Sequence, residues 1–498
     1  MATSSIAPSN VNDPYEQLIA SIISVERIPQ ARLQMEQEDQ TRLKSVMNDL
    51  DSKVSALNTL VKQFIDPFAN PFDARSASVP STGTFTASAG DSAAFGSHTL
   101  QVDRLARTDT RISNQRTAAA TTLSDFFAAN GGTQSFTIQV AAPTDSDPDN
   151  RVDVAVSVTP VGTTDKDILG EIASAINAAM DQAVEDGTIT SSQAAHSAVV
   201  NETSDTARLS LRSGQTGYTN RLQFVDSSAG LLSTLEVTNA AVASGTAGGQ
   251  VVSVGTSEID SELNSKFQLD GLTLYRSSNS VTDALDGVTL NLSKVSTTAE
   301  EFSIEPGGSS IKSQVEDFIA KYNDVLKYIA NKSSIDTETF TRGDFANDRA
   351  FTGLRYALRN DLAGQVTGQP DGAPSWLSDL GISLNDDGTL TLSDSDKLLS
   401  AVKENSTAVQ DFFSGTDGIA TRVSDVLATY VGADGLIEAR KTSLDDRIDR
   451  LDDQIDTWDT RLARRETQLR QKFAHLQNTI AMFQGQQQTF LSFFNSTQ

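Results

Sequence analysis

The sequence contains no cysteine, and this absence removes several kinds of site at once. Disulfide frameworks, cysteine-ligated zinc and thiol catalysis all require cysteine, so none of them is available to the chain. The three histidines, His98, His196 and His475, lie far apart in the sequence, and we expect each to be an ordinary side chain. The sequence therefore predicts neither a metal site nor a cofactor site.

Long apolar runs are also missing. No stretch reaches the length of about 18 apolar residues that a membrane-spanning helix needs. The first residues have neither the basic region nor the apolar region of a secretory signal peptide. We therefore expect a chain that stays in the cytoplasm or leaves the cell by a route that needs no such signal.

Basic residues are few relative to acidic ones. The 39 lysines and arginines stand against 65 aspartates and glutamates, which gives a net charge of −26. This balance argues against nucleic acid and against an anionic membrane as partners. Adaptation to a salt-rich habitat would give the same excess of acid. The length of 498 residues allows about three or four domains.

Sequence motifs of catalysis are missing as well. The chain has no GxGxxG, no P-loop and no GxSxG motif. Asp145, Asp147 and Asp149 have the spacing of a calcium loop, but Asn150 stands where glycine is needed and Val156 where the bidentate glutamate belongs. We therefore expect a solvated hairpin loop there, and the sequence predicts no enzyme.

The strongest pattern that is present is a heptad seam near the C-terminus. Within residues 443–494 apolar side chains recur at alternating steps of four and three, which indicates a coiled-coil helix. An eleven-residue step from Trp458 to Leu469 is a stutter, which locally unwinds a supercoil. The seam consists of Leu444, Ile448, Leu451, Ile455, Trp458, Leu462, Leu469, Phe473, Leu476, Ile480, Phe483, Phe490 and Phe494.

A second seam lies near the N-terminus and ends before Pro67. It consists of Leu43, Met47, Leu50, Val54, Leu57, Val61 and Phe64. Each seam requires a facing helix, so we expect the two to pair antiparallel as one stalk, which is either a tie between domains or a polymerisation element. Residues 477–498 carry no charge and several apolar side chains, so this tail either packs on its own chain or binds a neighbour.

The material between the seams differs from both ends. After Pro67 apolar residues alternate with polar ones, which predicts strands, and Val152 to Val158 is the clearest of them. A helix is expected from about Asp165, with Thr164 as its cap. Asp387-Gly388 predicts a hairpin turn. The predicted fold class is α+β and multidomain, with β-rich head domains on a helical leg.

Three blocks of the sequence resemble flagellar filament cap proteins, the hook-associated protein 2 family. The first block follows the N-terminal seam at residues 72–75 and 96–106. The second and most specific block is residues 267–290. The third includes Tyr322-Asn323, residues 381–390 and the coil at residues 461–473. Residues 168–224 are also similar to a motif that flagellins and cap proteins share, whereas residues 9–14 depart from the family's glycine-rich opening.

The resemblance implies a division into domains. It consists of a largely disordered segment 1–42, a leg helix 43–75, an inner head domain 76–113 and 238–308, an outer head domain 114–237, a helical leg domain 309–440, and a terminal coil and tail 441–498. The two seams would then be interfaces of the leg and of the assembly.

The resemblance also implies a function. Such a protein promotes the folding and insertion of exported flagellin at the distal tip of the flagellum, outside the cell, as a ring of copies that is most often a pentamer. Its other implied partners are hook–filament junction proteins and an export chaperone at the C-terminal helix. Export would use the flagellar secretion system without a cleaved signal peptide.

Other functions remain open on the residues alone. A flagellin or a hook–filament junction protein would also have paired terminal helices, although residues 267–290 favour a cap. A tip adhesin would use the β-rich head as its binding part. A secreted enzyme is the remaining class, and no catalytic group stands out for it.

Overall fold

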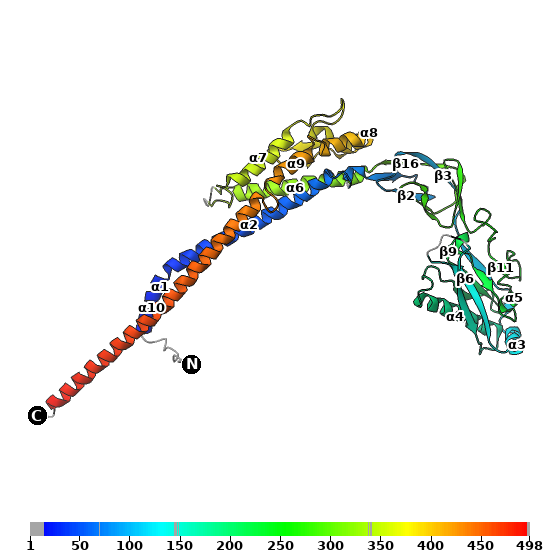
Figure 1. The fold of residues 1–498 in the computed structure, drawn as a ribbon, viewed down its shortest axis with the longest axis horizontal. Coiled ribbons are helices and arrows are strands. Elements are labelled where there is room, and N and C mark those ends of the chain that lie inside the picture. The colour runs from blue at the N-terminus through cyan, green and yellow to red at the C-terminus, as the bar shows by residue number, and fades with distance from the viewer. Residues whose placement is uncertain are drawn as a thin grey trace. The chain divides into compact units, whose positions relative to one another are not determined.

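The computed structural model describes residues 14–68, 70–143, 147, 149–336, 338 and 341–495, with the side chains of 14, 490 and 492–495 left out. The chain forms two compact units, Met1–Phe72 with Ser309–Gln498, and Asp73–Gly308. The first unit is mainly helical and the second mainly strand (Figure 1). Among the described residues, no helix has an apolar stretch long enough to cross a membrane.

The helical unit is built around the paired helices α2 and α10, which lie side by side (Figure 1). Their order is antiparallel, because Gln30 contacts Asp459 whereas Lys44 contacts Asp445. The expected pairing of the two chain ends is therefore confirmed. The elements are α1 (Pro14–Glu26), α2 (Ile28–Phe64), η1 (Pro71–Asp73), α6 (Gly308–Ser333), α7 (Arg349–Ala363), η3 (Leu377–Leu380), β17 (Ile382–Leu384), β18 (Leu390–Leu392), α8 (Ser395–Ser414), α9 (Ile419–Ala428) and α10 (Leu436–Asn495).

The second half of α2 is covered by more than α10. Its seam side chains share one core with those of α6, α7, α8 and α9. Phe64 lies at the centre, with ring centroids 5.5 Å from Phe72, 6.0 Å from Phe318 and 5.7 Å from Phe413. Each fully buried side chain of this size contributes about 1.5–3 kcal/mol, so this core dominates the stability of the unit.

Residues 14–42 differ from the expectation that segment 1–42 is largely disordered. They form α1 and the first half of α2, with a break at Arg27. Pro29 stands in the first turn of α2, where its missing N–H leaves no bond unmade. The apolar pattern missed this half because its seam is carried partly by the amides Gln30 and Gln37. Residues 1–13 lie outside the described part.

Beside a small cluster of Tyr218, Val254 and Leu263, the strand-rich unit contains two large cores. One joins the sheet β1-β16-β3-β12-β13 to the sheet β14-β15-β2. Phe267 of β12 stands opposite Val102 of β3 in the first sheet. The bounds are β1 (Arg75–Ser78), β2 (Phe85–Ala89), β3 (Gly96–Arg104), β12 (Ser265–Leu269), β13 (Leu272–Arg276), β14 (Ser280–Leu285), β15 (Val288–Leu292) and β16 (Glu300–Pro306).

The other core joins the sheet β10-β6-β7 to the sheet β11-β4-β9-β5, in which β8 also pairs with β9. Helix α4 packs its isoleucines into this core, and Thr164 caps it by accepting a hydrogen bond from the Asp167 amide, as predicted. The bounds are β4 (Thr108–Ile112), β5 (Arg116–Thr117), α3 (Thr122–Ala129), β6 (Gln134–Ala141), β7 (Arg151–Val158), α4 (Asp165–Glu185), β8 (His196–Asn201), β9 (Thr206–Thr216), η2 (Tyr218–Asn220), β10 (Gln223–Val225), α5 (Leu231–Thr234) and β11 (Gly249–Gln250).

The borders between these two cores differ from the expected ones. Strands β4 and β11 pair with each other, and β4 also pairs with β9, so both belong to the outer sheet. The outer part therefore begins before residue 114 and continues beyond residue 237. Strand pairs far apart in sequence leave no periodic signal, so composition alone could not place these borders.

Candidate assembly interface

A ladder of polar contacts fixes the register of α2 against α10. The Gln30 amide donates to the Asp459 carboxylate at 2.6 Å, the Gln37 amide donates to Asp452, and Lys44 forms an ion pair with Asp445. Both sets of residues step by seven, in opposite directions along the chain. A constant heptad register of this kind is that of an antiparallel coiled coil.

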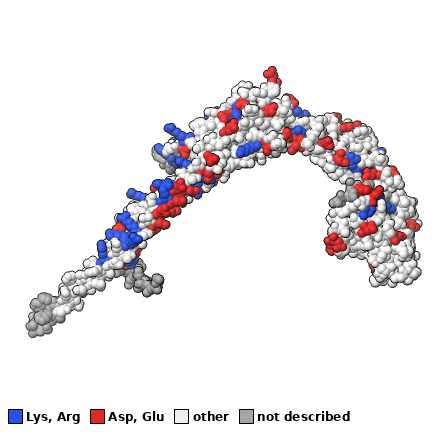
Figure 2. All heavy atoms as spheres, viewed as in Figure 1, with Lys and Arg blue, Asp and Glu red and all other residues white. Residues whose placement is uncertain are grey.

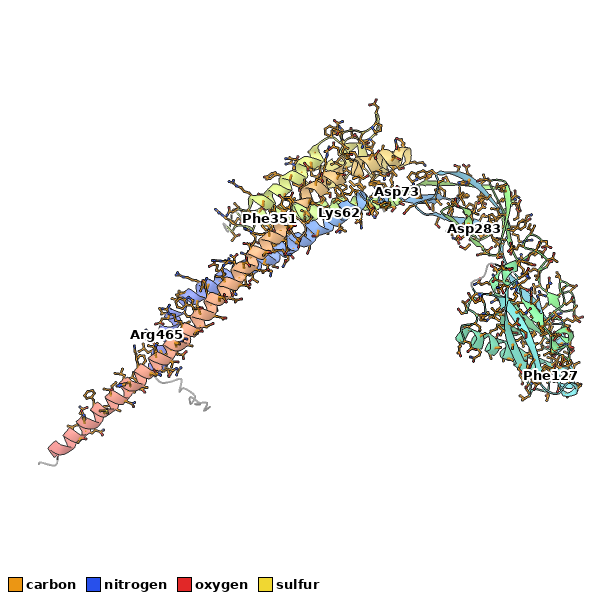
Figure 3. The ribbon with its side chains drawn as sticks, in the orientation of Figure 1. Lys62, Asp73, Phe127, Asp283, Phe351 and Arg465 are labelled. Carbon is orange, nitrogen blue, oxygen red and sulfur yellow. The ribbon has the colours of Figure 1, made fainter. Side chains whose placement is uncertain are left out.

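Ion pairs continue the contact along α1. Arg465 pairs with Glu26 at 3.0 Å and Arg470 with Glu16 at 2.7 Å. Arg465 lies on α10 where α1 and α10 run side by side (Figure 3). All four side chains are partly exposed, and such pairs contribute up to about 1 kcal/mol each. They therefore determine register more than stability.

The stutter in α10 coincides with the break between α1 and α2. Glu26, directly before the break at Arg27, contacts Arg465 inside the step from Trp458 to Leu469. Beyond this point along α10, α1 takes over as the partner helix and supplies a new apolar face, in which Ile19 packs with Leu469. The partner helix is thus interrupted where the seam loses its three-four alternation.

The predicted seam residues fall into three groups. Most are buried: Met47, Leu50, Val54, Leu57, Val61, Phe64, Leu444, Leu451, Ile455, Leu462 and Leu469. Four are half-buried: Leu43, Ile448, Trp458 and Phe473. Three are exposed: Leu476, Ile480 and Phe483. The side chains of Phe490 and Phe494 lie outside the described ones.

The last described contact of the seam is an aromatic one. The ring of Phe473 lies 5.6 Å from that of Tyr15, measured between centroids. Beyond it, α10 continues with Leu476 45%, Phe483 65% and Met482 66% exposed. Contiguous exposed apolar side chains on a soluble protein mark interaction sites. We call the residues Leu476, Ile480 and Phe483 the terminal stripe.

Several family-like motif residues hold the fold together. The Tyr322 hydroxyl donates to the Gly388 carbonyl at 3.1 Å. The Asn323 side chain donates to the Leu390 carbonyl and accepts a hydrogen bond from the Leu390 amide. They thereby attach the β17–β18 hairpin to α6. The hairpin has the predicted register, with Leu384 opposite Leu390.

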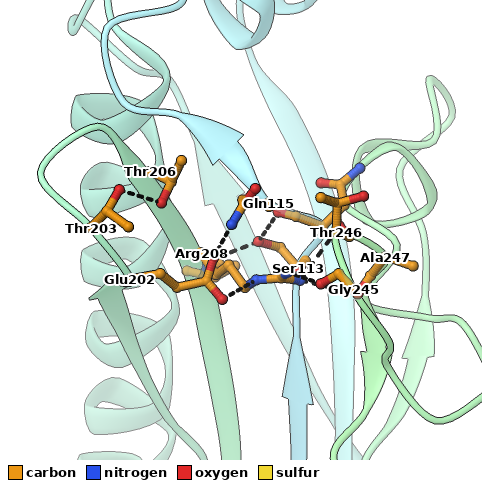
Figure 4. A network of polar contacts seen from close by, with 12 residues as sticks. Ser113, Gln115, Glu202, Thr203, Thr206, Arg208, Gly245, Thr246 and Ala247 are labelled. Carbon is orange, nitrogen blue, oxygen red and sulfur yellow. Dashed lines mark hydrogen bonds and ion pairs between the residues drawn. The ribbon is translucent and has the colours of Figure 1, made fainter.

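Arg208 of the flagellin-like motif is a buried hub in the outer part of the strand-rich unit (Figure 4). Its guanidinium donates to the Glu202 carboxylate at 2.8 Å and to the carbonyls of Ser113 at 2.9 Å and Ala247 at 3.0 Å. It also donates to the Gly245 carbonyl. Arg208 therefore fastens the loop before β11, a contact that sequence reasoning missed because its partners are distant in the chain.

The loop with calcium-like aspartate spacing is held by hydrogen bonds and an ion pair within the protein, where it is described. The Asp147 carboxylate accepts from the Asp149 amide at 2.9 Å, and the Asp149 carboxylate pairs with Arg221. Asp145 lies outside the described residues. In the described part of the chain, no group of three or more histidine, aspartate or glutamate side chains is arranged to hold a metal.

Helices from both ends of the chain that pair in register, with an apolar stripe exposed beyond the pair, define the class: a structural protein that assembles with other chains. The family model described as flagellar hook-associated protein 2 N-terminus matches residues 14–109. The model of the same protein's C-terminus matches residues 263–485. The chain belongs to the flagellar hook-associated protein 2 family.

Individual proteins agree with this assignment. The A-type flagellar hook-associated protein 2 of Pseudomonas aeruginosa is 26% identical over 450 residues, which is 87% of this chain and 85% of the relative. The B-type protein of that species is 27% identical over 187 residues, 36% of this chain and 39% of the relative. The crystal structure of the flagellar cap protein FliD D1-D2-D3 domains from Escherichia coli has a TM-score of 0.53 at 23% identity, covering 80% of this chain and 99% of that one, and it supports the fold.

Proposed function

We propose that this chain caps the distal tip of the bacterial flagellar filament, outside the cell, and promotes the folding and insertion of exported flagellin there. Family membership supports the proposal, and the terminal stripe is the observation that carries it. The heptad seam continues through Leu476, Ile480 and Phe483. The described partner helix α1, however, begins at Pro14, and its Tyr15 reaches only as far along α10 as Phe473. A seam that continues beyond its partner is suited to bind helices of other subunits.

The chemistry of the tail suits reversible binding. Residues 477–498 carry no charge, so their burial against another subunit requires no charge to be desolvated. Each large apolar side chain of the terminal stripe gains about 1.5–3 kcal/mol on full burial. A few such contacts hold a cap on the filament end and still allow it to move when a new flagellin subunit arrives.

We also propose the further partners that family membership implies. The cap works as a ring of copies, most often a pentamer, and hook–filament junction proteins are its first support. The exposed stripe needs cover before assembly, which favours an export chaperone at the C-terminal helix. Export proceeds through the flagellar secretion system.

Replacing the stripe tests the proposal. The variant Leu476→Ser/Ile480→Ser/Phe483→Ser keeps the buried seam, so it is expected to fold and to be secreted without capping filaments. Bacteria that carry it should release unpolymerised flagellin into the medium. The matched control Gln484→Ser/Gln486→Ser changes exposed residues of the same helix and should support normal filaments.

Removing the whole protein separates capping from the other candidate functions. A strain without it should have hooks but no filaments, with flagellin in the culture medium. Filaments of normal length in that strain would contradict the proposal and would leave the adhesin as the alternative.

A further inference from the structure

Helix α10 has two charged edges that follow the same three-four spacing. Asp446, Asp449, Asp453 and Asp456 form one row, which we call the acidic edge. Arginines at positions 447, 450, 461 and 464 form the other row, the basic edge, with uncharged residues at 454 and 457 between them. Residues three or four apart share a helix face, so each row is a separate stripe along the rod.

The surface view agrees with these two stripes. Along the paired helices α2 and α10, blue side chains gather on one edge and red ones on the other (Figure 2). The acidic edge is not neutralised within the described residues, because the ion pairs there include none of its four aspartates. On the basic edge, neither Arg450 nor Arg464 has an ion-pair partner among the described residues.

The basic edge also carries a groove of about 880 Å³ where α1 turns into α2. Its lining includes the apolar side chains of Trp458, Val25 and Pro29. Its charged lining consists of Arg461, Arg464 and the Arg465–Glu26 ion pair. The Arg461 guanidinium lies over the Trp458 ring, 4.8 Å from its centroid. Tryptophan and arginine are enriched in interface hot spots, and arginine binds carboxylates bidentately.

We propose that this groove binds the acidic edge of a second copy of the chain. The occupant follows from charge complementarity: α10 itself carries an unneutralised row of carboxylates, spaced to lie along another helix, on a different face from the groove. The proposal rests on the proposed function, because it names the surface through which copies of the cap associate.

The placement of the two edges determines the symmetry. A two-fold contact through the basic edges alone would bring arginine against arginine, which is unfavourable. A contact of basic edge with acidic edge leaves a free acidic edge on one copy and a free basic edge on the other. Such a head-to-tail contact repeats from copy to copy and closes into a ring when the rotation allows it. The interface is electrostatic, so raising the salt concentration should weaken it.

Charge reversal on full-length protein tests the pairing. One variant, Arg461→Glu/Arg464→Glu, replaces the two arginines of the groove with acidic side chains. A second, Asp453→Lys/Asp456→Lys, replaces two carboxylates of the acidic edge with basic side chains. Each alone should self-associate only at concentrations about a hundredfold higher, because like charges then face one another. Sedimentation and native mass spectrometry at low salt measure the effect.

Mixing the two variants is the decisive step. In an alternating open assembly or an even-numbered ring, every contact again joins an acidic edge to a basic one, whereas a five-membered ring keeps one like-charge contact. An equimolar mixture should therefore associate again near the parent concentration, in even-numbered assemblies. A chain carrying all four substitutions should also associate with itself. The control Lys62→Glu/Lys327→Glu has the same net charge as the first variant, lies away from both edges and should behave like the parent.

Each outcome decides the inference separately from the capping function. Parent-like association of either single-edge variant would overturn it, as would a mixture that stays dissociated. Circular dichroism verifies that every variant keeps its helical content. A protein that passes the mixing test but does not cap filaments in cells would contradict the proposed function and leave the interface standing.

Discussion

Two segments of the same rod use the same heptad spacing with different side chains. In the proximal segment, residues 43–64 of α2, the seam is apolar and shares a core with α6 to α9. The distal segment consists of residues 14–42 packed against residues 445–473. There α10 still has leucine and isoleucine in the seam, whereas α2 has amides such as Gln30 and Gln37 at the facing positions.

The difference shows how one rod can hold firmly at one end and open at the other. Buried apolar side chains supply most of the stability of a helix pair, whereas exposed polar pairs mainly select the register. The proximal segment should therefore unfold only with the whole helical unit. The distal segment should open by itself, which suits a part that has to engage other subunits.

The largest expected effect is at the proximal core. Phe64→Ala removes a fully buried ring between Phe318 and Phe413 and leaves a cavity. It should lower the free energy of unfolding of the helical unit by about 3–5 kcal/mol. Urea unfolding followed by circular dichroism measures this, with exposed Phe68→Ala as the control. Equal losses for both variants would mean that the proximal core is not the stability centre.

Leu469→Ala should have a smaller and strictly local effect. Leu469 packs with Ile19 and Ile23 in a small cluster of its own, separate from the main core. We expect a loss of about 2 kcal/mol, at the low end for such a change, confined to the distal segment. Hydrogen exchange of α1 amides should then be about thirtyfold faster, with α6 amides unchanged. Faster exchange throughout both helices would show that the two segments are one cooperative unit.

Replacing a polar contact between α2 and α10 by an apolar one should stabilise the distal segment. Gln30 is buried and donates to Asp459. The double variant Gln30→Leu/Asp459→Leu should stabilise the segment by about 1 kcal/mol, because paired leucines need no desolvated polar group. Gln30→Leu alone should gain less, since its leucine faces the exposed Asp459 carboxylate instead of another leucine. Hydrogen exchange distinguishes the two, and an equal gain from the single variant would contradict the polar-ladder interpretation.

The two segments also differ in how well the sequence predicts them, because one has an apolar seam and the other a partly polar one. The apolar seams, the Thr164 cap and the Asp387-Gly388 hairpin were predictable because each is a local pattern of residue types. The apolar residues from Tyr15 to Val25 predict a short helix, and α1 confirms it. The helical residues 28–42 could not be predicted, because glutamine at a seam position looks like a surface residue. Its partner, Asp459, is hundreds of positions away in the chain.

The rest of the site could not be predicted for a related reason. Arg208 sits in a strand of alternating leucines, and nothing local indicates that its guanidinium reaches the carbonyls of Ser113 and Ala247. The terminal stripe was recognisable as apolar sequence, but its exposure depends on where the partner helix α1 begins. Sequence pattern gives the faces of elements, whereas the contacts that connect them require the fold.

The smallest expected effect is within the proximal segment and depends on pH. Lys441 of α10 contacts Glu438 and Asp51, and hydrogen bonds to these carboxylates raise its pKa above the ordinary value. A lysine whose pKa is raised on folding stabilises the fold below its unfolded pKa of about 10.4, and this stabilisation is lost as the pH rises through the folded pKa. The contribution is at most about 1 kcal/mol, since the contacts are near the surface.

The variant Lys441→Met should therefore be less stable than the parent at pH 8, and the difference should disappear at strongly alkaline pH. Thermal unfolding at a series of pH values measures it. Burial also raises the pKa of Tyr328, which destabilises the fold in the same alkaline range, so Tyr328→Phe is the matched control for that contribution. A difference between Lys441→Met and the parent that stays constant from pH 8 to alkaline pH would assign Lys441 a packing role in place of a charge role.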